Sequence, residues 1–129
     1  MKRVTGIGGV FFKCEDPAKM KEWYGKHLGL PVTDWGASFR WRTVDDPEKV
    51  GRTEWSTMKN DTDYLQPSDK PFMINYRVDN LVALLEQLKA EGVQIAGEMQ
   101  EFEYGKFAWI MDPEGHKIEL WEPPAEEPL

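Results

Sequence analysis

The chain has 129 residues and a net charge of −7, with 16 Lys and Arg residues against 23 Asp and Glu residues, and 40% of it is hydrophobic. These values are typical of one globular domain with a packed core, and the acidic balance argues against a nucleic-acid partner, which requires a basic surface. Cys14 is the only cysteine, which excludes an internal disulfide and fits a cytoplasmic location, and no apolar run approaches a membrane span.

The first half of the chain predicts a strand, a helix and three further strands. The β-forming run RVTGIGGVFFKC covers residues 3–14. Asp16 can then cap a helix that starts at Pro17 and ends at Gly29. Three short β-like runs follow, over residues 30–35, 38–44 and 52–58.

The second half repeats this order after a polar, proline-bearing segment that we interpret as a linker over about residues 61–70. Residues 72–78 predict a strand, and Asn80 can cap a leucine-rich helix that ends at Gly92. Residues 93–99, 106–112 and 116–122 predict three more strands. The last two of these are separated by the turn sequence DPEG.

The two halves also share a similar sequence segment: DPEKVGRTEW at 46–55 parallels DPEGHKIELW at 112–121. This similarity indicates an internal duplication. We therefore predict an α+β fold of two tandem βαβββ modules within a single domain spanning 1–129. The modules cover about 1–60 and 71–123 and form a curved, half-open mixed β-sheet barrel with helices outside and a cleft between them. An acidic, proline-rich tail over 124–129 is expected to be a solvated end.

The duplicated unit and its ending, DPEGHKIELWEP, resemble the vicinal oxygen chelate superfamily, which includes glyoxalase I, bleomycin-resistance proteins and extradiol dioxygenases. The segment KEWYGKHLGL and the pair Tyr104-Gly105 add to the resemblance. The resemblance implies a cleft in which metal-dependent members bind one divalent ion. The ligands there come from the first, fourth, fifth and eighth strands, usually with His on the first and fifth and Glu on the eighth.

Carried onto this chain, the resemblance places Glu119 at the eighth-strand position and, by the repeat, Glu54 at the fourth. The fifth-strand position falls near Met73, or at Asn75 if the register slips by two, and the first-strand position is Gly9. Neither position holds a histidine, so we expect no metal cofactor. If a divalent metal does bind, Glu119 and Glu54 are its expected ligands. The space beside Gly9 is expected to hold substrate or a neighbouring aromatic ring.

Strand alternation points Glu119 and Glu54 into the cleft, where paired carboxylates can act as a catalytic acid and base. The alternative is that they bond to basic residues on neighbouring strands. The remaining predicted lining is aromatic and methionine-rich, which suits an apolar or planar ligand, although these side chains can instead simply fill the cleft. In the segment SFRWR either Phe39 and Trp41 or Arg40 and Arg42 face inward. The predicted ligand-binding residues are Phe11, Trp41, Met73, Asn75, Tyr104, Trp109, Met111 and Trp121.

Three functions remain open at this point. The first, which we favour, is metal-free binding of a small, apolar or aromatic molecule. The second is a lyase, isomerase or dioxygenase that uses Glu119 and Glu54 with or without a metal. The third is an interaction module whose cleft is filled. By resemblance we also expect a homodimer.

Overall fold

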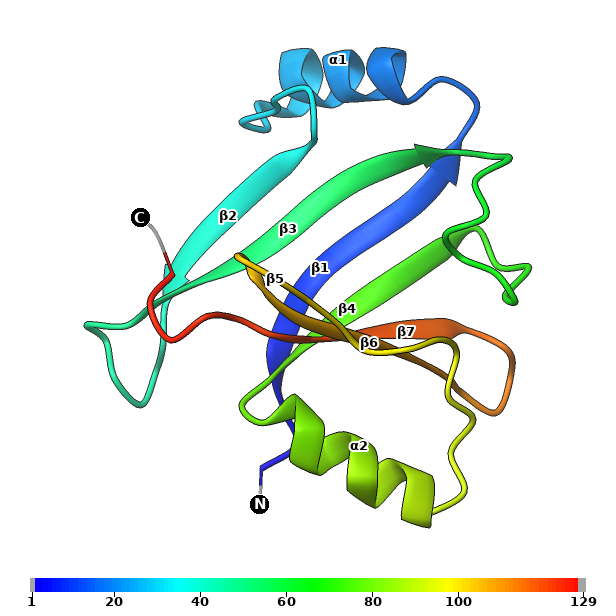
Figure 1. Cartoon of the computed structure of the whole chain (residues 1–129). Helices are drawn as coiled ribbons and strands as arrows, with labels where there is room; N and C mark the ends of the chain where they lie inside the picture. Colours follow the sequence, from blue (N-terminus) through cyan, green and yellow to red (C-terminus); the bar gives the residue numbers. More distant parts are fainter. Residues whose placement is uncertain (1, 128–129) are drawn as a thin grey trace.

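A computed structural model describes residues 2–127, which form one curved mixed β-sheet with two helices outside it (Figure 1). The strand order is β2-β3-β1-β4-β7-β6-β5. The predicted α+β fold class is confirmed. In chain order the elements are β1 (Val4–Cys14), α1 (Pro17–Leu28), β2 (Ala37–Arg42), β3 (Val50–Lys59), β4 (Phe72–Val78), α2 (Leu81–Ala90), β5 (Gln100–Phe102), β6 (Gly105–Met111) and β7 (Lys117–Glu122).

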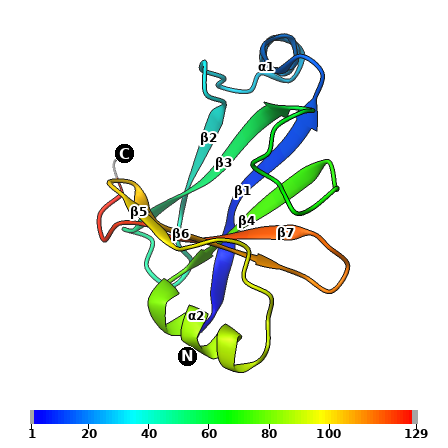
Figure 2. The same cartoon turned by 45° about the vertical axis from the view of Figure 1, so that its right-hand side comes forward.

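The sheet is continuous because the first strands of the two halves, β1 and β4, pair with each other in antiparallel orientation. β1 also pairs in parallel with β3, and β4 pairs in parallel with β7. Each half therefore contributes one side of the sheet. The curved sheet carries α1 and α2 near opposite ends of the molecule (Figure 2).

Two predicted strands do not form. Residues 30–35 connect α1 to β2 as an irregular segment, in which Pro31 offers no N–H and the Thr33 hydroxyl caps a turn by accepting from the backbone N–H of Trp35 at 3.3 Å. In residues 93–99 only Ile95 forms an isolated bridge, with Ile110. The positive φ of +114° at Gly97 interrupts extension there, and the short strand β5 forms later instead.

The helices are attached in different ways. Asn80 caps α2 by accepting from the backbone N–H of Ala83 at 3.1 Å. The leucine face of α2 then packs on β4, β6 and β7, and the buried core there comprises Leu81, Leu84, Leu85, Leu88, Val78, Ala108, Ile110 and Leu120. By contrast α1 has no buried residue, and Tyr24 contacts the ring of Trp55 at 4.9 Å between centroids. No helix within residues 2–127 is long and apolar enough to span a membrane.

The predicted linker, residues 61–70, packs against the sheet, and we call it the covering loop. Leu65, in the middle of it, is fully buried and belongs to a second core cluster with Phe11, Met73 and Trp109. The loop therefore joins residues of both halves across the concave side of the sheet.

The prediction that the tail is a solvated end is also partly wrong. Glu127 folds back and pairs with Arg77, and both side chains are only 10% exposed. A buried guanidinium needs an anionic partner, which explains why an acidic tail returns to the sheet. Residues 128–129 of the predicted tail lie outside the described residues.

Candidate functional site

Six neighbouring strands place one residue each in a continuous row across the sheet. The strand register pairs Glu54 with Gly9, Gly9 with Asn75, and Asn75 with Glu119. The register therefore places Asn75, and not Met73, level with the other family ligand positions. From β2 to β6 the row reads Ser38, Glu54, Gly9, Asn75, Glu119 and Trp109.

Glu119 is the most enclosed charged group of this row, with only 4% of its surface exposed. Its Oε1 accepts from the amide of Asn75 at 2.7 Å, and its Oε2 accepts from the indole N–H of Trp109 at 2.9 Å. The hydroxyl of Tyr64, in the covering loop, also donates to Oε2. Three donors around one carboxylate replace the water it loses on burial, so the carboxylate is a satisfied structural group in this arrangement.

Tyr64 and Lys117 join the covering loop to Glu119, and the sequence patterns did not single out either residue. Burial raises the pKa of the Tyr64 hydroxyl far above its ordinary value of 10.0, and the negative charge of Glu119 raises it further. The ammonium of Lys117 donates to the backbone carbonyl of Tyr64 at 2.6 Å, and burial lowers the pKa of this ammonium. The one available sequence signal is Tyr64-Leu65, an apolar pair inside an otherwise polar loop.

Glu54 lies across the sheet from Glu119, and both side chains line the same cavity. The hydroxyl of Ser38 donates to Oε2 of Glu54. Since two strands, β1 and β4, separate β3 from β7, the two backbones are about 14 Å apart along the sheet at ~4.8 Å per strand. Each carboxylate therefore acts with its own set of partners.

The two glycines of β1 make room for this arrangement. A Cβ built on Gly9 would lie 2.8 Å from the ring of Phe11, so a neighbouring aromatic occupies the space that a first-strand ligand would need. A Cβ built on Gly8 would lie 2.1 Å from Oδ1 of Asn75. This oxygen is buried and has no hydrogen-bond partner among residues 2–127.

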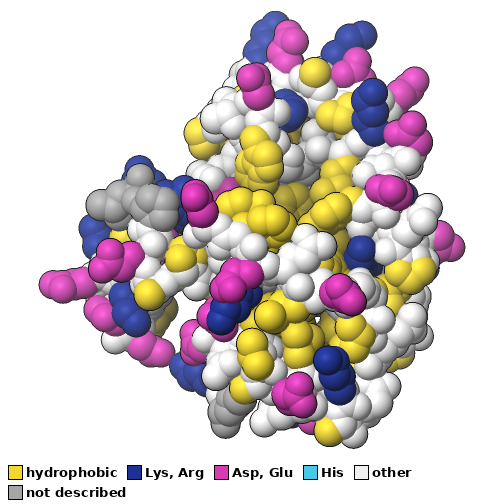
Figure 3. Space-filling model, viewed as in Figure 1, with side chains coloured by type: hydrophobic (Ala, Val, Ile, Leu, Met, Phe, Trp, Pro, Cys, Tyr) yellow, Lys and Arg dark blue, Asp and Glu magenta, His cyan; other side chains and the backbone are white. Residues whose placement is uncertain are grey.

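The concave side of the sheet holds a cavity of about 790 Å³. Hydrophobic side chains gather in the middle of the face seen in Figure 3, between the ends that carry α1 and α2. This size and lining suit a small organic molecule with an apolar or planar body. The lining residues are Gly8, Phe11, Asp34, Trp35, Glu54, Ser56, Thr57, Met58, Tyr64, Asn75, Tyr104, Phe107, Glu119 and Trp121.

The cavity brings together both predicted glutamates and four of the eight predicted ligand-binding residues: Phe11, Asn75, Tyr104 and Trp121. The other four, Trp41, Met73, Trp109 and Met111, lie outside the lining. Met73 is completely buried beside Leu65, and the indole of Trp109 is turned toward Glu119. Both positions follow from the covering loop, whose packing on the sheet the sequence patterns did not predict. Leu65 of this loop packs with Met73 and Trp109.

Trp41 lies beside the guanidinium of Arg77, whose carbon is 5.0 Å from the ring centroid. Met111 is buried at the end of β6, where it pairs with Lys117 of β7. The sequence predicts that the segment at 38–42 turns either Phe39 and Trp41 or Arg40 and Arg42 toward the cleft. None of these four residues is among the lining residues of the cavity. Ser38 from this segment contacts the site instead, through Glu54.

The residues of the row do not fit a divalent metal. Gly9 has no side chain, and Glu119 already accepts three hydrogen bonds. Within residues 2–127 no three His, Cys, Asp or Glu side chains form a group that could hold a metal ion. Open metal sites in proteins usually supply three or more such ligands.

Both histidines lie away from the cavity lining. His27 packs against Trp23 on α1, with ring centroids 5.1 Å apart. His116 contacts the carboxylate of Asp112 through Nδ1 at 2.8 Å, inside the DPEG turn. Hydrogen bonds from the backbone N–H groups of His116 and Glu114 help to lower the pKa of Asp112, which stabilises this turn at neutral pH.

The raised pKa of Tyr64 predicts that the folded protein loses stability at alkaline pH. Above pH 10.0 the unfolded chain loses the Tyr64 proton while the folded chain keeps it. The stabilising contribution of this hydroxyl is therefore complete below that pH and is lost as the pH rises. We expect the free energy of unfolding of the wild type to fall more steeply between about pH 9 and pH 11 than that of Tyr64→Phe. Urea denaturation across this range measures it, and parallel curves would contradict the assignment.

Comparison with known proteins supports the architecture. The family model for the Glyoxalase/Bleomycin resistance protein/Dioxygenase superfamily matches residues 6–120. A search of curated proteins found no match. Among solved structures, a Streptomyces coelicolor methylmalonyl-CoA epimerase variant in complex with 2-nitronate-propionyl-CoA is similar, at 17% identity and a TM-score of 0.71. The alignment covers 98% of this chain and 99% of that one.

The methylmalonyl-CoA epimerase from Mycobacterium tuberculosis is 21% identical, with a TM-score of 0.63 and coverage of 95% of this chain and 91% of that chain. A methylmalonyl-CoA epimerase in complex with methylmalonyl-CoA and NH4+ has a TM-score of 0.71 at 18% identity, with 97% of this chain and 99% of that one covered. At these identities the structures share the fold. Because the family model covers most of the sequence, the chain belongs to the Glyoxalase/Bleomycin resistance protein/Dioxygenase superfamily.

Proposed function

We propose that this protein binds a small, apolar or aromatic molecule in its cleft without the divalent metal that related enzymes use. The observation that carries the proposal is the state of Glu119, whose two oxygens already accept hydrogen bonds from Asn75, Tyr64 and Trp109. A metal would have to displace these donors from a buried carboxylate. The ring of Phe11, which fills the space beside Gly9, leaves no room for a fourth ligand there.

The cavity wall supports the same ligand class. Tyr104 and Phe107 lie edge to face at its rim, and Phe107 stacks on Trp121 with ring planes 9° apart. Aromatic walls of this kind favour a flat apolar body by stacking and by burial of surface.

Metal and ligand screens of the purified protein test the proposal. We expect elemental analysis to find no stoichiometric metal, and Ni²⁺, Zn²⁺ and Mn²⁺ to leave the melting temperature unchanged. Small aromatic compounds are expected to raise it by several degrees at saturating concentration, because they bind only the folded chain. Stoichiometric metal that is lost in Glu119→Gln would overturn the proposal.

The second candidate is an enzyme of the lyase, isomerase or dioxygenase type, and one observation favours it. Glu54 lines the same cavity as Glu119, and Ser38 orients its carboxylate through one oxygen only. A carboxylate in this position can remove a proton from a bound ligand. Deuterium exchange at the acidic C–H groups of 2-tetralone in D2O separates the two candidates. Faster exchange with the wild type than with Glu54→Gln would favour the enzyme, and equal rates would favour binding alone.

A homodimer and a cytoplasmic location complete the proposal. The dimer is proposed by analogy with the family, in which clefts are commonly built from paired modules. The location is proposed because the single Cys14 leaves the fold independent of disulfide bonds. Sedimentation analysis of the purified protein tests the first, and fractionation of cells that express it tests the second.

A further inference from the structure

Arg77 lies beside the cavity in surroundings that are built for one planar anion. Its side chain is only 10% exposed. The ring of Trp41 lies 5.0 Å from the guanidinium carbon and the ring of Trp121 lies 5.1 Å from it. Aromatic faces stabilise a guanidinium while leaving its N–H groups for partners in its own plane.

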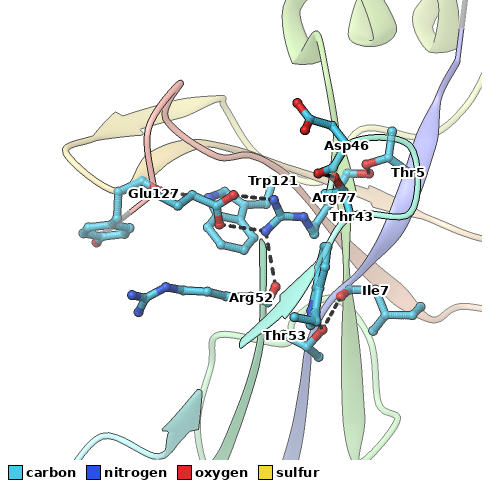
Figure 4. Close-up of polar contacts among 11 residues, drawn as sticks. Thr5, Ile7, Thr43, Asp46, Arg52, Thr53, Arg77, Trp121 and Glu127 are labelled. Carbon is cyan, nitrogen blue, oxygen red and sulfur yellow. Dashed lines mark hydrogen bonds and ion pairs between the residues drawn. The ribbon is translucent and has the colours of Figure 1, made fainter. Parts of the chain in front are cut away.

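Those N–H groups hold the carboxylate of Glu127. The two terminal nitrogens of Arg77 donate to its two oxygens at 2.9 Å and 2.6 Å, and one of them also donates to the backbone carbonyl of Arg52 at 3.2 Å (Figure 4). This paired geometry is the one that carboxylates prefer. Since a buried cation without an anion is strongly unfavourable, the site requires a carboxylate or a similar anion at all times.

The anion that fills the site belongs to a short tail. Glu127 lies five residues beyond the end of β7 at Glu122, and the intervening Ala125 and Glu126 are exposed. A tethered carboxylate competes as if it were present at about millimolar concentration. A free carboxylate can make the same two hydrogen bonds without ordering the tail, so it can replace Glu127 if other contacts add to its affinity.

Such contacts lie next to the site. Trp121 faces Arg77 with its ring, lines the cavity and stacks on Phe107 at 6.0 Å. Gly8 also lines the cavity, and a Cβ built on it would lie 3.0 Å from Cγ of Arg77. Within the described chain the lining itself includes carboxylates but no Lys, Arg or His side chain. An anionic ligand would therefore find its positive partner at Arg77.

We propose that Arg77, Trp41 and Trp121 form a carboxylate-binding subsite of the cleft, which Glu127 closes in the ligand-free chain. A ligand with a carboxylate on an aromatic body displaces the tail, places its carboxylate on Arg77 and places its body in the cavity that Trp121 lines. The inference rests on the proposed function, because it names the chemical class of the cleft's ligand.

Two probes of the same shape test the subsite: 2-naphthoate and its uncharged analogue 2-naphthylmethanol. Glu127→Gln removes the competing charge, so we expect it to bind 2-naphthoate about tenfold or more tightly than the wild type. Its affinity for 2-naphthylmethanol should stay unchanged. Glu126→Gln is the matched control, because it removes the same charge from an exposed position of the same tail, and it should leave both affinities unchanged. Isothermal titration measures all of them.

A measurement on the wild type avoids any effect of substitution on folding. In ¹⁵N NMR spectra, saturating 2-naphthoate should shift the amide signals of residues 125–127 toward values of a free chain, while 2-naphthylmethanol should not. If the tail signals stay in place on saturation, or if both tail variants bind 2-naphthoate as the wild type does, the subsite is rejected while binding of 2-naphthylmethanol still supports the proposed function. If neither probe binds any variant, the proposed function and the subsite are both rejected.

Discussion

The carboxylate of Glu119 accepts hydrogen bonds from three parts of the chain: Asn75 on β4, Trp109 on β6 and Tyr64 in the covering loop. Burying an ionised carboxylate is costly, and these donors repay that cost only when all three segments are in place. The interaction therefore fixes the loop over the sheet. It also explains why Leu65, next to Tyr64, is completely buried against Phe11 and Met73.

The same constraint determines the chemistry that the cleft can offer. In the family, the eighth-strand glutamate stands in a row with histidines, whereas here its neighbours in the register are Asn75 and, beyond it, Gly9. The amide of Asn75 donates a hydrogen bond to Glu119, and the ring of Phe11 fills the space beside Gly9. Glu119 therefore has its hydrogen-bond partners within the protein, at a position where related enzymes place a metal ligand. What remains open is an aromatic cavity that Glu54 lines, with the proposed Arg77 subsite beside it.

Local patterns in the sequence were sufficient for much of the fold. The leucine spacing from Leu81 to Leu88 predicts α2, and alternation in residues 116–122 predicts that Glu119 faces the cleft, whose lining includes it. The failures come from contacts between residues far apart in the chain. No local period marks Tyr64 as a partner of Glu119, or Glu127 as a partner of Arg77, 50 residues away. Trp41 and Trp109 are aromatic, as a cavity wall requires, but neither lines the cavity. The ring of Trp41 faces Arg77, and the indole N–H of Trp109 donates to Glu119.

A double-mutant cycle between Tyr64 and Glu119 tests the central claim most directly. The free energy of unfolding is measured by urea denaturation at neutral pH for the wild type, Tyr64→Phe, Glu119→Gln and the double variant. If the buried carboxylate holds the loop through this hydrogen bond, the two substitutions are coupled by about 1.5–3 kcal/mol, as expected for a hydrogen bond to a charged group. Effects that simply add would contradict the account, because the loop would then be held by packing alone.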